Sequence, residues 1–491
     1  MRVENVSAAI LSNARRRPNH IALMQARETV SCVQLEQRVA HAAGALRKRG
    51  VTQGEIVAVS MGDTIDQIVM IFALMRLGAV MLPMDVRWTP AESLRVAEFF
   101  SASTLLLDHA EIRANKIKTI RVDDGWNKES VNATPITKWH TTSESPIVLS
   151  LSSGTTGIPK GPMVSHGLYI RRMFYELVTN GTSQDEINML ATPLYFGGGR
   201  NITLMNIIIG ATVVLYPPPY QIEDLVRSIN DLKVTSVFVV PTLLRRMLAL
   251  PYDGGLLFPN LRIMMSSGAV LHKEELQLAR QRLTPNLVNV YATTEAGVVT
   301  QLMPTDSESK AGSVGRPVFL ADVQVTDDNH QTLPPGEVGR IRYRTLAVPD
   351  GFYNNPEESA RSFHDGWFYP GDLGKLDSDG YLYVVGRGKD MIIRGGINIY
   401  PADIEAVLNA HPSVLDASVL GWAGGEMGEE IAAFVARKGA VSEDELTEYC
   451  RGNLARYKVP KRIFFVDQMP RNDAGKVIKA KLAALLPAAG V

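Results

Sequence analysis

Short apolar runs alternate with segments of helical periodicity along most of the chain, and this alternation restricts the fold more than any other feature. The runs include EIVAVSM (55–61), STLLLDH (103–109), ATVVLYP, VTSVFVV and LVNVYAT. They are rich in β-branched residues and apolar throughout, which is typical of strands covered on both faces. We therefore predict an α/β fold with mostly parallel sheets and helices on both faces.

Local signals indicate where several helices begin. Thr89 is followed by Pro90 and, three residues on, by Glu92. This pattern predicts an N-cap, a proline at the first helical position and a capping box. Ser165 is placed to cap the helix that follows it, and Pro401 marks another helix start.

The length of 491 residues suggests two to four domains or subdomains. From about Ala321 the pattern changes to a β-meander, and a third region starts near Lys389. We predict a large N-terminal part over residues 1–387, made of two sheet subdomains and a small β-barrel-like part at roughly 312–386. A small, mobile α+β lid domain is predicted over 388–491.

The charge balance is neutral, with 51 lysines and arginines against 51 aspartates and glutamates. Binding to a nucleic-acid backbone or an anionic lipid surface relies on excess positive charge. The composition therefore gives no argument for either, and we expect no nucleic-acid partner.

The most apolar stretch, residues 68–86, contains Arg76 and Gly78 and is interrupted again at Pro83. It is too broken for a membrane span, so we predict a buried helix followed by a buried strand and no transmembrane segment.

The first residues lack the continuous apolar region of a secretory signal. Two distant cysteines without a CxxC motif argue against structural zinc and fit a reducing cytoplasm.

The segment SSGTTGIPKG (152–161) carries the chemistry of an anion site. Glycines let backbone N–H groups converge on an anion, while four hydroxyls and Lys160 add donors and positive charge. A Walker A loop does not fit, because only two residues separate Gly154 from Gly157 and Lys160 is followed by Gly161. A flexible surface loop is the alternative. The strand pattern before the segment and the lysine within it favour a polyphosphate site.

Small or polar residues follow several later apolar runs: Pro241, Ser267, Gly268, Thr293, Thr294 and Glu295. In open α/β sheets, ligands bind beyond the carboxyl ends of the strands. These residues are therefore expected near a binding site.

Five motifs in order give a resemblance to a known family. SSGTTGIPKG is followed by YATTEAG (291–297), YPGDLG (369–374), GRGKDMIIRGGINIYPADIE (386–405) and RNDAGKVIK (471–479). Together they resemble the adenylate-forming superfamily of acyl- and aryl-CoA synthetases, peptide-synthetase adenylation domains and luciferases. The resemblance covers nearly the whole chain and is strongest to AMP-forming acyl- or aryl-CoA ligases. It implies that a carboxylate attacks ATP to give acyl-AMP, from which a thiol takes the acyl group.

The resemblance also implies roles for individual residues around ATP and Mg²⁺. Tyr291 would stack on adenine and Asp372 would accept hydrogen bonds from both ribose hydroxyls. Glu295 and Thr156 would hold the metal, since a hard cation prefers oxygen ligands. The implied ATP site comprises Ser152, Ser153, Gly154, Thr155, Thr156, Gly157, Lys160, Ser267, Gly268, Ala269, Asn289, Tyr291, Ala292, Thr293 and Asp372.

The implied catalytic residues are Lys476, Thr294, Glu295 and Arg387. Lys476 would bridge the attacking carboxylate and the α-phosphate, Thr294 would donate to that phosphate, and Arg387 would assist at the ribose or phosphate. The resemblance places a hinge at Lys389.

The hinge would let the small domain alternate between adenylation and thioester formation. The segment Arg394, Gly395 and Gly396 would line the channel for the thiol.

The predicted acyl pocket comprises Tyr195, Phe196, Gly197, Gly198, Arg200 and Pro241. Phe196 stands where many relatives have a histidine that helps to gate the carboxylate. Gly197 stands where amino-acid-activating relatives often have an aspartate, which counts against an α-amino acid. The three glycines from Gly197 onward would leave room beside the acyl group. Arg200 either meets a second carboxylate of the substrate or, the interpretation we favour, is a surface or structural arginine.

The sequence thus predicts an acid–CoA ligase that uses ATP, Mg²⁺ and CoA. A neutral, largely apolar acid is expected, either aromatic or a medium-chain fatty acid. One alternative is a stand-alone enzyme that loads a carrier protein. The other is a nucleotide-binding regulatory protein without activity, against which the intact Lys476, Glu295 and Asp372 count.

Overall fold

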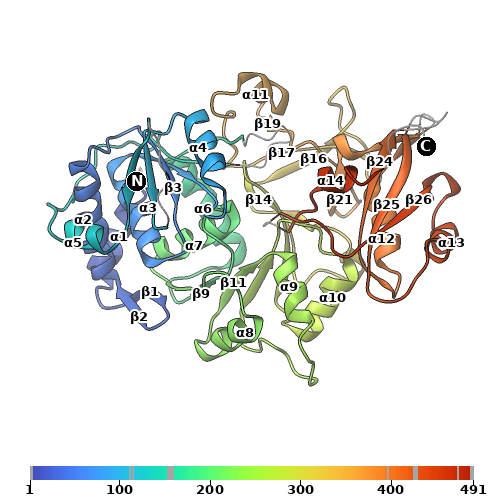
Figure 1. The fold of residues 1–491 in the computed structure, drawn as a ribbon, viewed down its shortest axis with the longest axis horizontal. Helices are drawn as coiled ribbons and strands as arrows, with labels where there is room; N and C mark the ends of the chain where they lie inside the picture. Colours follow the sequence, from blue (N-terminus) through green and yellow to red (C-terminus); the bar gives the residue numbers. More distant parts are fainter. Residues whose placement is uncertain are drawn as a thin grey trace.

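The computed structural model describes residues 4–109, 112, 116–151, 160–394, 397–423, 429–472 and 475–486. Figure 1 shows the N-terminal part, from blue through yellow to light orange, and beside it a smaller C-terminal domain in orange and red. Two α/β sheets, an antiparallel β subdomain and this small domain make up the molecule, as the alternating sequence pattern predicts.

A nine-stranded sheet forms the centre of the N-terminal part. Its strands are parallel from β13 to β1, and β14, β15 and β2 run antiparallel at the two edges. In spatial order they are β15 (Arg316–Pro317), β14 (Gly297–Leu302), β13 (Leu287–Thr293), β12 (Ile263–Ser266), β11 (Ser236–Val239), β9 (Ile187–Leu190), β10 (Thr212–Leu215), β1 (Ile21–Gln25) and β2 (Glu28–Ser31).

The second sheet has six strands and is parallel except for the pair β7 and β8. The strand that precedes the glycine-rich segment is its β7. In spatial order the strands are β6 (Lys118–Arg121), β5 (Thr104–Leu107), β3 (Ile56–Ser60), β4 (Val80–Pro83), β7 (Pro146–Leu149) and β8 (Met163–Ser165).

Helices cover both sheets, and the largest apolar core joins strands of the two sheets with α2, α3, α6 and α7. The broken apolar stretch is a buried helix, α3, followed by the buried strand β4, as predicted. The helices are α1 (Ala8–Arg16), α2 (Cys32–Lys48), α3 (Ile65–Leu77), α4 (Pro90–Phe99), α5 (Asp124–Val131), α6 (His166–Asn180), α7 (Gly197–Ile209), α8 (Ile222–Asp231), α9 (Pro241–Leu248), α10 (Lys273–Arg282) and the 3₁₀ turn η1 (Glu308–Lys310).

The predicted capping signals are confirmed. The Thr89 hydroxyl accepts the Glu92 N–H at 3.3 Å, and the Glu92 carboxylate accepts the Thr89 N–H at 2.9 Å. Ser165 accepts the Leu168 N–H at 3.2 Å at the start of α6. Within the described residues, no helix has both the length and the apolar character needed to cross a membrane.

The β subdomain is antiparallel and lies where the sequence predicts a barrel-like part. β20 pairs with both β17 and β21, and β16 pairs with β17. Its elements are β16 (Asp322–Thr326), β17 (Gly339–Arg344), α11 (Pro356–Ser362), β18 (Phe363–His364), β19 (Trp367–Phe368), β20 (Asp372–Leu376) and β21 (Leu382–Arg387).

The small domain follows a single 3₁₀ turn after β21. Its central strand β25 is almost entirely buried between β24, β26 and helices, and its core is separate from those of the N-terminal part. Its elements are η2 (Gly388–Asp390), β22 (Ile392–Arg394), β23 (Ile397–Ile399), α12 (Pro401–Asn409), β24 (Val414–Ala423), β25 (Glu429–Arg437), α13 (Glu443–Asn453), η3 (Arg456–Lys458), β26 (Arg462–Val466) and α14 (Lys479–Ala483).

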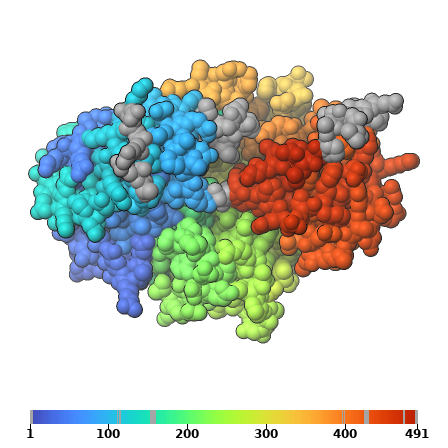
Figure 2. Space-filling model, in the orientation of Figure 1, coloured from blue at the N-terminus to red at the C-terminus, as the bar shows by residue number. Residues whose placement is uncertain are grey.

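The small domain rests on the N-terminal part. In Figure 2 its red and orange surface abuts the green and yellow surface that includes α9 and α10. Asn409 of α12 lies 3.3 Å from the His272 ring nitrogen, at the start of α10. This arrangement brings the last predicted motif, around Lys476, against the start of α9, which follows strand β11.

Candidate active site

The turn between β13 and β14 carries two polar side chains that have no hydrogen-bond partner among the described residues. The Thr293 hydroxyl closes the turn, since it accepts the Ala296 N–H at 3.2 Å and bonds to the Tyr343 hydroxyl at 2.5 Å. Thr294 and Glu295 differ from it, because no described residue hydrogen-bonds to either side chain. Glu295 is nevertheless a buried residue, only 7% exposed. A buried carboxylate without a partner suits a hard cation such as Mg²⁺.

The Asp372 carboxylate is held from two sides. Its Oδ1 pairs with Nε of Arg387 at 2.6 Å, and its Oδ2 accepts the Tyr291 hydroxyl at 2.5 Å. The first contact follows from strand register, since Asp372 and Arg387 are cross-strand partners in β20 and β21. Each carboxylate oxygen has a second lone pair, so Asp372 can still accept two hydroxyl groups.

Tyr291 is kept neutral in this arrangement. Burial first, and then the neighbouring Asp372 charge, raise the pKa of its phenol well above the usual range. The hydroxyl therefore remains a donor to Asp372, and the ring packs among the partly buried residues of the β subdomain core.

Lys476 is presented by a hairpin turn that leans on the N-terminal part. Its N–H donates to the Asn472 side chain at 2.9 Å, and the strands on either side meet at the pair of Arg471 and Val477. A Cβ on Gly475 would lie 2.6 Å from Thr242 Oγ1, so the turn approaches the start of α9 closely. Residues 473 and 474 of this motif lie outside the described residues.

The charged residues that act on Lys476 indicate which parts of the chain its hairpin turn approaches. Partial burial first, and then Arg387, lower the pKa of its ammonium, while Asp372 and Glu295 act in the opposite direction. Lys476 is nevertheless exposed to solvent in this arrangement. Residues of four separate motifs thus lie close enough for their charges to act on Lys476, and together they are two cations and two anions.

The residues predicted around the nucleotide base lie at adjacent strand ends. Ser267 is buried directly after β12, and Gly268 there has a φ of +101° that only glycine adopts readily. Asn289 on β13 is the register partner of Ser266 on β12, and Ala292 lies further along β13. The chain thus places the two segments on neighbouring strands.

Lys160 has protein partners in this structure. Its ammonium pairs with the Glu358 carboxylate of α11 and lies 4.6 Å from the centre of the Phe352 ring. The other predicted phosphate-loop residues lie outside the described residues: Ser152, Ser153, Gly154, Thr155, Thr156 and Gly157. The predicted metal ligand Thr156 is among them.

Aromatic rings gather at the start of α7. The rings of Tyr195 and Phe196 are 4.6 Å apart, and Arg87 contacts the Tyr195 ring and hydroxyl. Among the described residues, a Cβ on Gly197 would meet nothing closer than Ser150 Oγ at 4.0 Å, but a Cβ on Gly198 would lie 2.9 Å from the Phe238 ring. The expectation of room beside all three glycines is therefore wrong at Gly198.

The remaining pocket residues are at element starts. The third glycine, Gly199, faces backbone, since its Cβ would lie 2.2 Å from the Thr192 carbonyl oxygen. Pro241 occupies the first position of α9, next to Thr242.

Arg200 is buried, with 1% of the residue exposed, and holds the backbone of the loop before α7. Its guanidinium donates to the Leu194 and Tyr195 carbonyls at 3.1 and 3.2 Å and to the Ser150 hydroxyl at 3.2 Å. Burial lowers its pKa to about 10. These contacts support the structural interpretation of Arg200 over contact with a substrate carboxylate.

The predicted hinge and thiol-channel residues lie at the start of the small domain. Lys389 is exposed within η2. Arg394 pairs with Glu430 at 2.7 Å and donates to the Tyr457 carbonyl at 3.3 Å. Gly395 and Gly396 lie outside the described residues.

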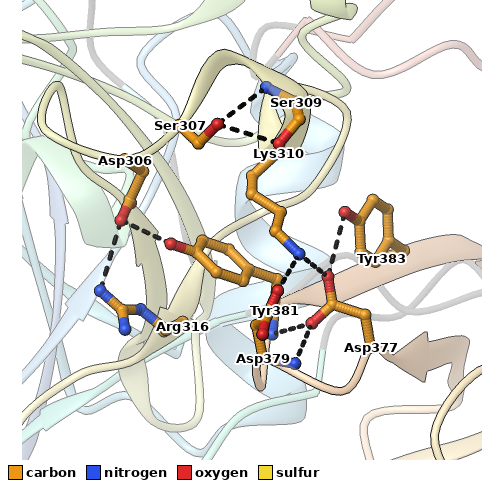
Figure 3. A network of polar contacts seen from close by, with 9 residues as sticks. All are labelled: Asp306, Ser307, Ser309, Lys310, Arg316, Asp377, Asp379, Tyr381 and Tyr383. Atoms are coloured by element: carbon orange, nitrogen blue, oxygen red, sulfur yellow. Dashed lines mark hydrogen bonds and ion pairs between the residues drawn. The ribbon is translucent and has the colours of Figure 1, made fainter.

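A cluster of charged and aromatic side chains ties the hairpin of β20 and β21 to the large sheet (Figure 3). The Lys310 ammonium pairs with Asp377 at 2.7 Å and Asp379 at 2.5 Å, both in the turn of that hairpin. Tyr381 donates to Asp306 at 2.8 Å. Because Lys310 and Asp306 follow β14, these contacts fix the hairpin that carries Asp372 relative to the strand that follows Glu295.

Sequence reasoning missed the residues that support the turn between β13 and β14. Arg172 and Tyr175 reach this turn from α6, and Tyr343 reaches it from β17. One signal was available in the sequence: Arg172 interrupts the face of α6 that Tyr169 and Met173 make apolar. A charged residue on a buried helix face must find polar partners.

Comparison with known proteins identifies the family. The model described as AMP-binding enzyme matches residues 11–353, and the model of its C-terminal domain matches residues 403–476. A 2-succinylbenzoate–CoA ligase from Geobacillus kaustophilus is 33% identical over 487 residues, which cover 96% of each chain.

Two solved structures superpose along almost the whole chain. ATP-bound MatB from Rhodopseudomonas palustris has a TM-score of 0.92 at 25% identity and 99% coverage of both chains. The o-succinylbenzoate CoA synthetase MenE from Bacillus subtilis, in complex with the acyl-adenylate OSB-AMP, has a TM-score of 0.89 at 28% identity and 98% coverage of both. The latter protein has also been solved with ATP and a magnesium ion. The resemblance carried by the five motifs is confirmed, and the chain belongs to the AMP-binding enzyme family.

Proposed function

We propose that Lys476, Glu295, Asp372 and Arg387 form the adenylation site of this chain, which is an AMP-forming acid–CoA ligase. The observation that carries the residue roles is the convergence of these four side chains from both domains. MgATP, a carboxylic acid and CoA are the substrates.

The first step joins two anions, so it depends on positioning and on neutralising charge. A carboxylate oxygen of the acid attacks the α-phosphorus, the bond to the bridging oxygen of the β-phosphate breaks, and pyrophosphate leaves. Asp372 accepts hydrogen bonds from the ribose hydroxyls and fixes the nucleotide. Lys476 donates to the α-phosphate and the attacking oxygen, and Thr294 adds a second donor.

Glu295, with Thr156, would hold the Mg²⁺ that arrives with ATP. The fit rests on the buried Glu295 carboxylate, which no described residue hydrogen-bonds. The ion supplies positive charge to the phosphate oxygens.

The second step needs a different arrangement at the same carbonyl carbon. The thiol sulfur of CoA attacks it, the bond to AMP oxygen breaks, and the thiol proton passes to solvent. We propose that the Lys476 hairpin leaves and that the hinge lies at Lys389, directly after the end of the N-terminal part at residue 387. Movement there would bring the segment that starts at Arg394 towards the adenylate.

For the acid, we propose an aromatic carboxylic acid. The support is the group of rings at the start of α7, from Tyr195, Phe196 and Phe238, together with the space that the described residues leave at Gly197. The relative from Geobacillus kaustophilus is named for an aromatic substrate, 2-succinylbenzoate. A medium-chain fatty acid is the alternative.

A carrier-protein thiol is a second candidate acceptor. The small domain exposes the apolar side chains of Ile393 and Ile397, and Tyr457 lies close by, beside Arg394. We also propose a cytoplasmic location, based on the two buried cysteines, neither of which forms a disulfide.

Mass spectrometry of the products tests these proposals. The protein is given ATP, Mg²⁺ and a panel of aryl, fatty and dicarboxylic acids, with and without CoA. An aryl-CoA that forms only with CoA is the expected result. An adenylate that accumulates and ignores CoA would favour the carrier protein, and the absence of any adenylate would favour the regulatory alternative.

A further inference from the structure

Helix α6 buries a charged residue that the reaction scheme does not use. Arg172 is only 2% exposed and faces the turn between β13 and β14 rather than solvent. Burying a guanidinium is costly unless its donors are satisfied. The groups to which the Arg172 guanidinium donates therefore indicate its function.

Arg172 and Tyr175 together bind three consecutive backbone carbonyls of this turn. Nη1 of Arg172 donates to the Thr294 carbonyl at 3.4 Å and Nη2 to the Glu295 carbonyl at 2.5 Å. The Tyr175 hydroxyl donates to the Ala296 carbonyl at 2.7 Å. With their carbonyls held from behind, Thr294 and Glu295 keep both side chains free of protein partners among the described residues.

The next residue shows how tightly the turn is pressed against α6. Gly297 has a φ of +77°, and a Cβ there would lie 2.5 Å from the Tyr175 hydroxyl oxygen and 3.3 Å from Cγ of Arg172. Arg172 also donates to the Ala347 carbonyl at 3.3 Å, in the segment that leads from β17 to α11. The helix thus fixes the backbone path on both sides of Glu295.

We infer that Arg172, assisted by Tyr175, is a positioning residue that holds Glu295 and Thr294 in place for MgATP through their backbone carbonyls. The inference rests on the proposed role of Glu295. Arg172 touches neither side chain of the pair, so its effect passes through the main chain. Residues that orient a metal ligand typically change metal affinity by about 10- to 100-fold when they are replaced.

The test measures ATP binding by titration calorimetry, with and without Mg²⁺, in the full chain. The wild type is expected to bind ATP more tightly when Mg²⁺ is present. Arg172→Met, which keeps the aliphatic volume, is expected to reduce that Mg²⁺-dependent gain by about tenfold or more and to change the metal-free affinity, to which Thr294 contributes, by a smaller factor. Arg172→Lys should restore part of the gain, because an ammonium retains one donor to the turn.

Arg171→Met is the matched control. Arg171 is the neighbouring exposed residue of α6 and donates to the Leu346 carbonyl at 3.1 Å, away from the turn. A folded Arg172→Met protein with the same Mg²⁺-dependent gain as this control would overturn the inference. If Arg172→Met does not fold, Arg172→Lys and Tyr175→Phe carry the test, and a wild-type gain in both would overturn it.

The calorimetric result is separate from the fate of the proposed function. ATP binding with Mg²⁺ needs no acid, so the inference is tested even if no acid is activated. Failure of the wild type to form any adenylate would refute the ligase proposal and leave the binding comparison intact.

Discussion

Glu176 should make the stability of this protein depend on pH in a predictable direction. It lies one helical turn after Arg172 in α6 and is 5% exposed. Burial raises the pKa of its carboxyl from 4.5 to about 7, and Arg172 offsets only part of that rise. The native state therefore binds a proton that the unfolded state has lost between pH 4.5 and 7.

The sign and size follow from linkage. Because the native state binds more protons in this window, the contribution of Glu176 to stability falls as the pH rises from 4.5 to 7. A separation of about 2.5 pH units corresponds to about 3 kcal/mol above pH 7, as an order of magnitude. Glu176→Gln keeps the shape and stays neutral, so it should match the wild type near pH 4.5 and exceed its stability above pH 7.

The assay is urea unfolding of the full chain from pH 4.5 to 8, followed by circular dichroism. The measured quantity is the difference in the free energy of unfolding between variant and wild type at each pH. The contributions of other titrating groups cancel in this difference, including that of His166, whose pKa burial lowers to about 4. Glu223→Gln, an exposed glutamate on α8, is the control and should give a flat difference. A flat difference for Glu176→Gln as well would refute the reasoning.

Three further changes test the site. Lys476→Ala should slow adenylate formation by about 100- to 1,000-fold in pyrophosphate exchange and leave ATP affinity in calorimetry unchanged, so a normal exchange rate would disprove its role. Tyr291→Phe removes a donor to Asp372 and should weaken ATP binding by about tenfold in the same titration, whereas unchanged affinity would mean that the hydroxyl does not position the carboxylate. Gly198→Ala places a methyl 2.9 Å from the Phe238 ring and should lower stability by about 1–3 kcal/mol in urea unfolding, whereas wild-type stability would show that the ring moves freely.

The sequence predicted what depends on neighbouring residues. The capping box at Thr89 and Glu92 is a contact over three positions, and the alternation of apolar runs with helical segments is also local. The five motifs in order also predicted the family and the reaction class. They did so because their resemblance to a known family implies roles for residues whose neighbours in space lie far away in the chain.

Contacts between residues that are distant in the chain could not be predicted from the sequence. That Asp372 pairs with Arg387 depends on the register of β20 and β21, which includes an irregularity after Leu373. That the space at Gly198 of α7 is filled depends on Phe238, which lies forty residues further on in strand β11. No periodicity within one element encodes which ring fills which gap.

The cluster around Lys310 has a mechanical consequence for the catalytic cycle. It anchors the closed end of the β20–β21 hairpin to the large sheet, while the open end carries Asp372 and Arg387 and leads directly into η2. Rotation of the small domain at Lys389 would therefore leave the β20–β21 hairpin in place on the large sheet. The contacts of Asp372 with the nucleotide would not change while the Lys476 hairpin moves away. AMP would therefore keep one position through both half-reactions.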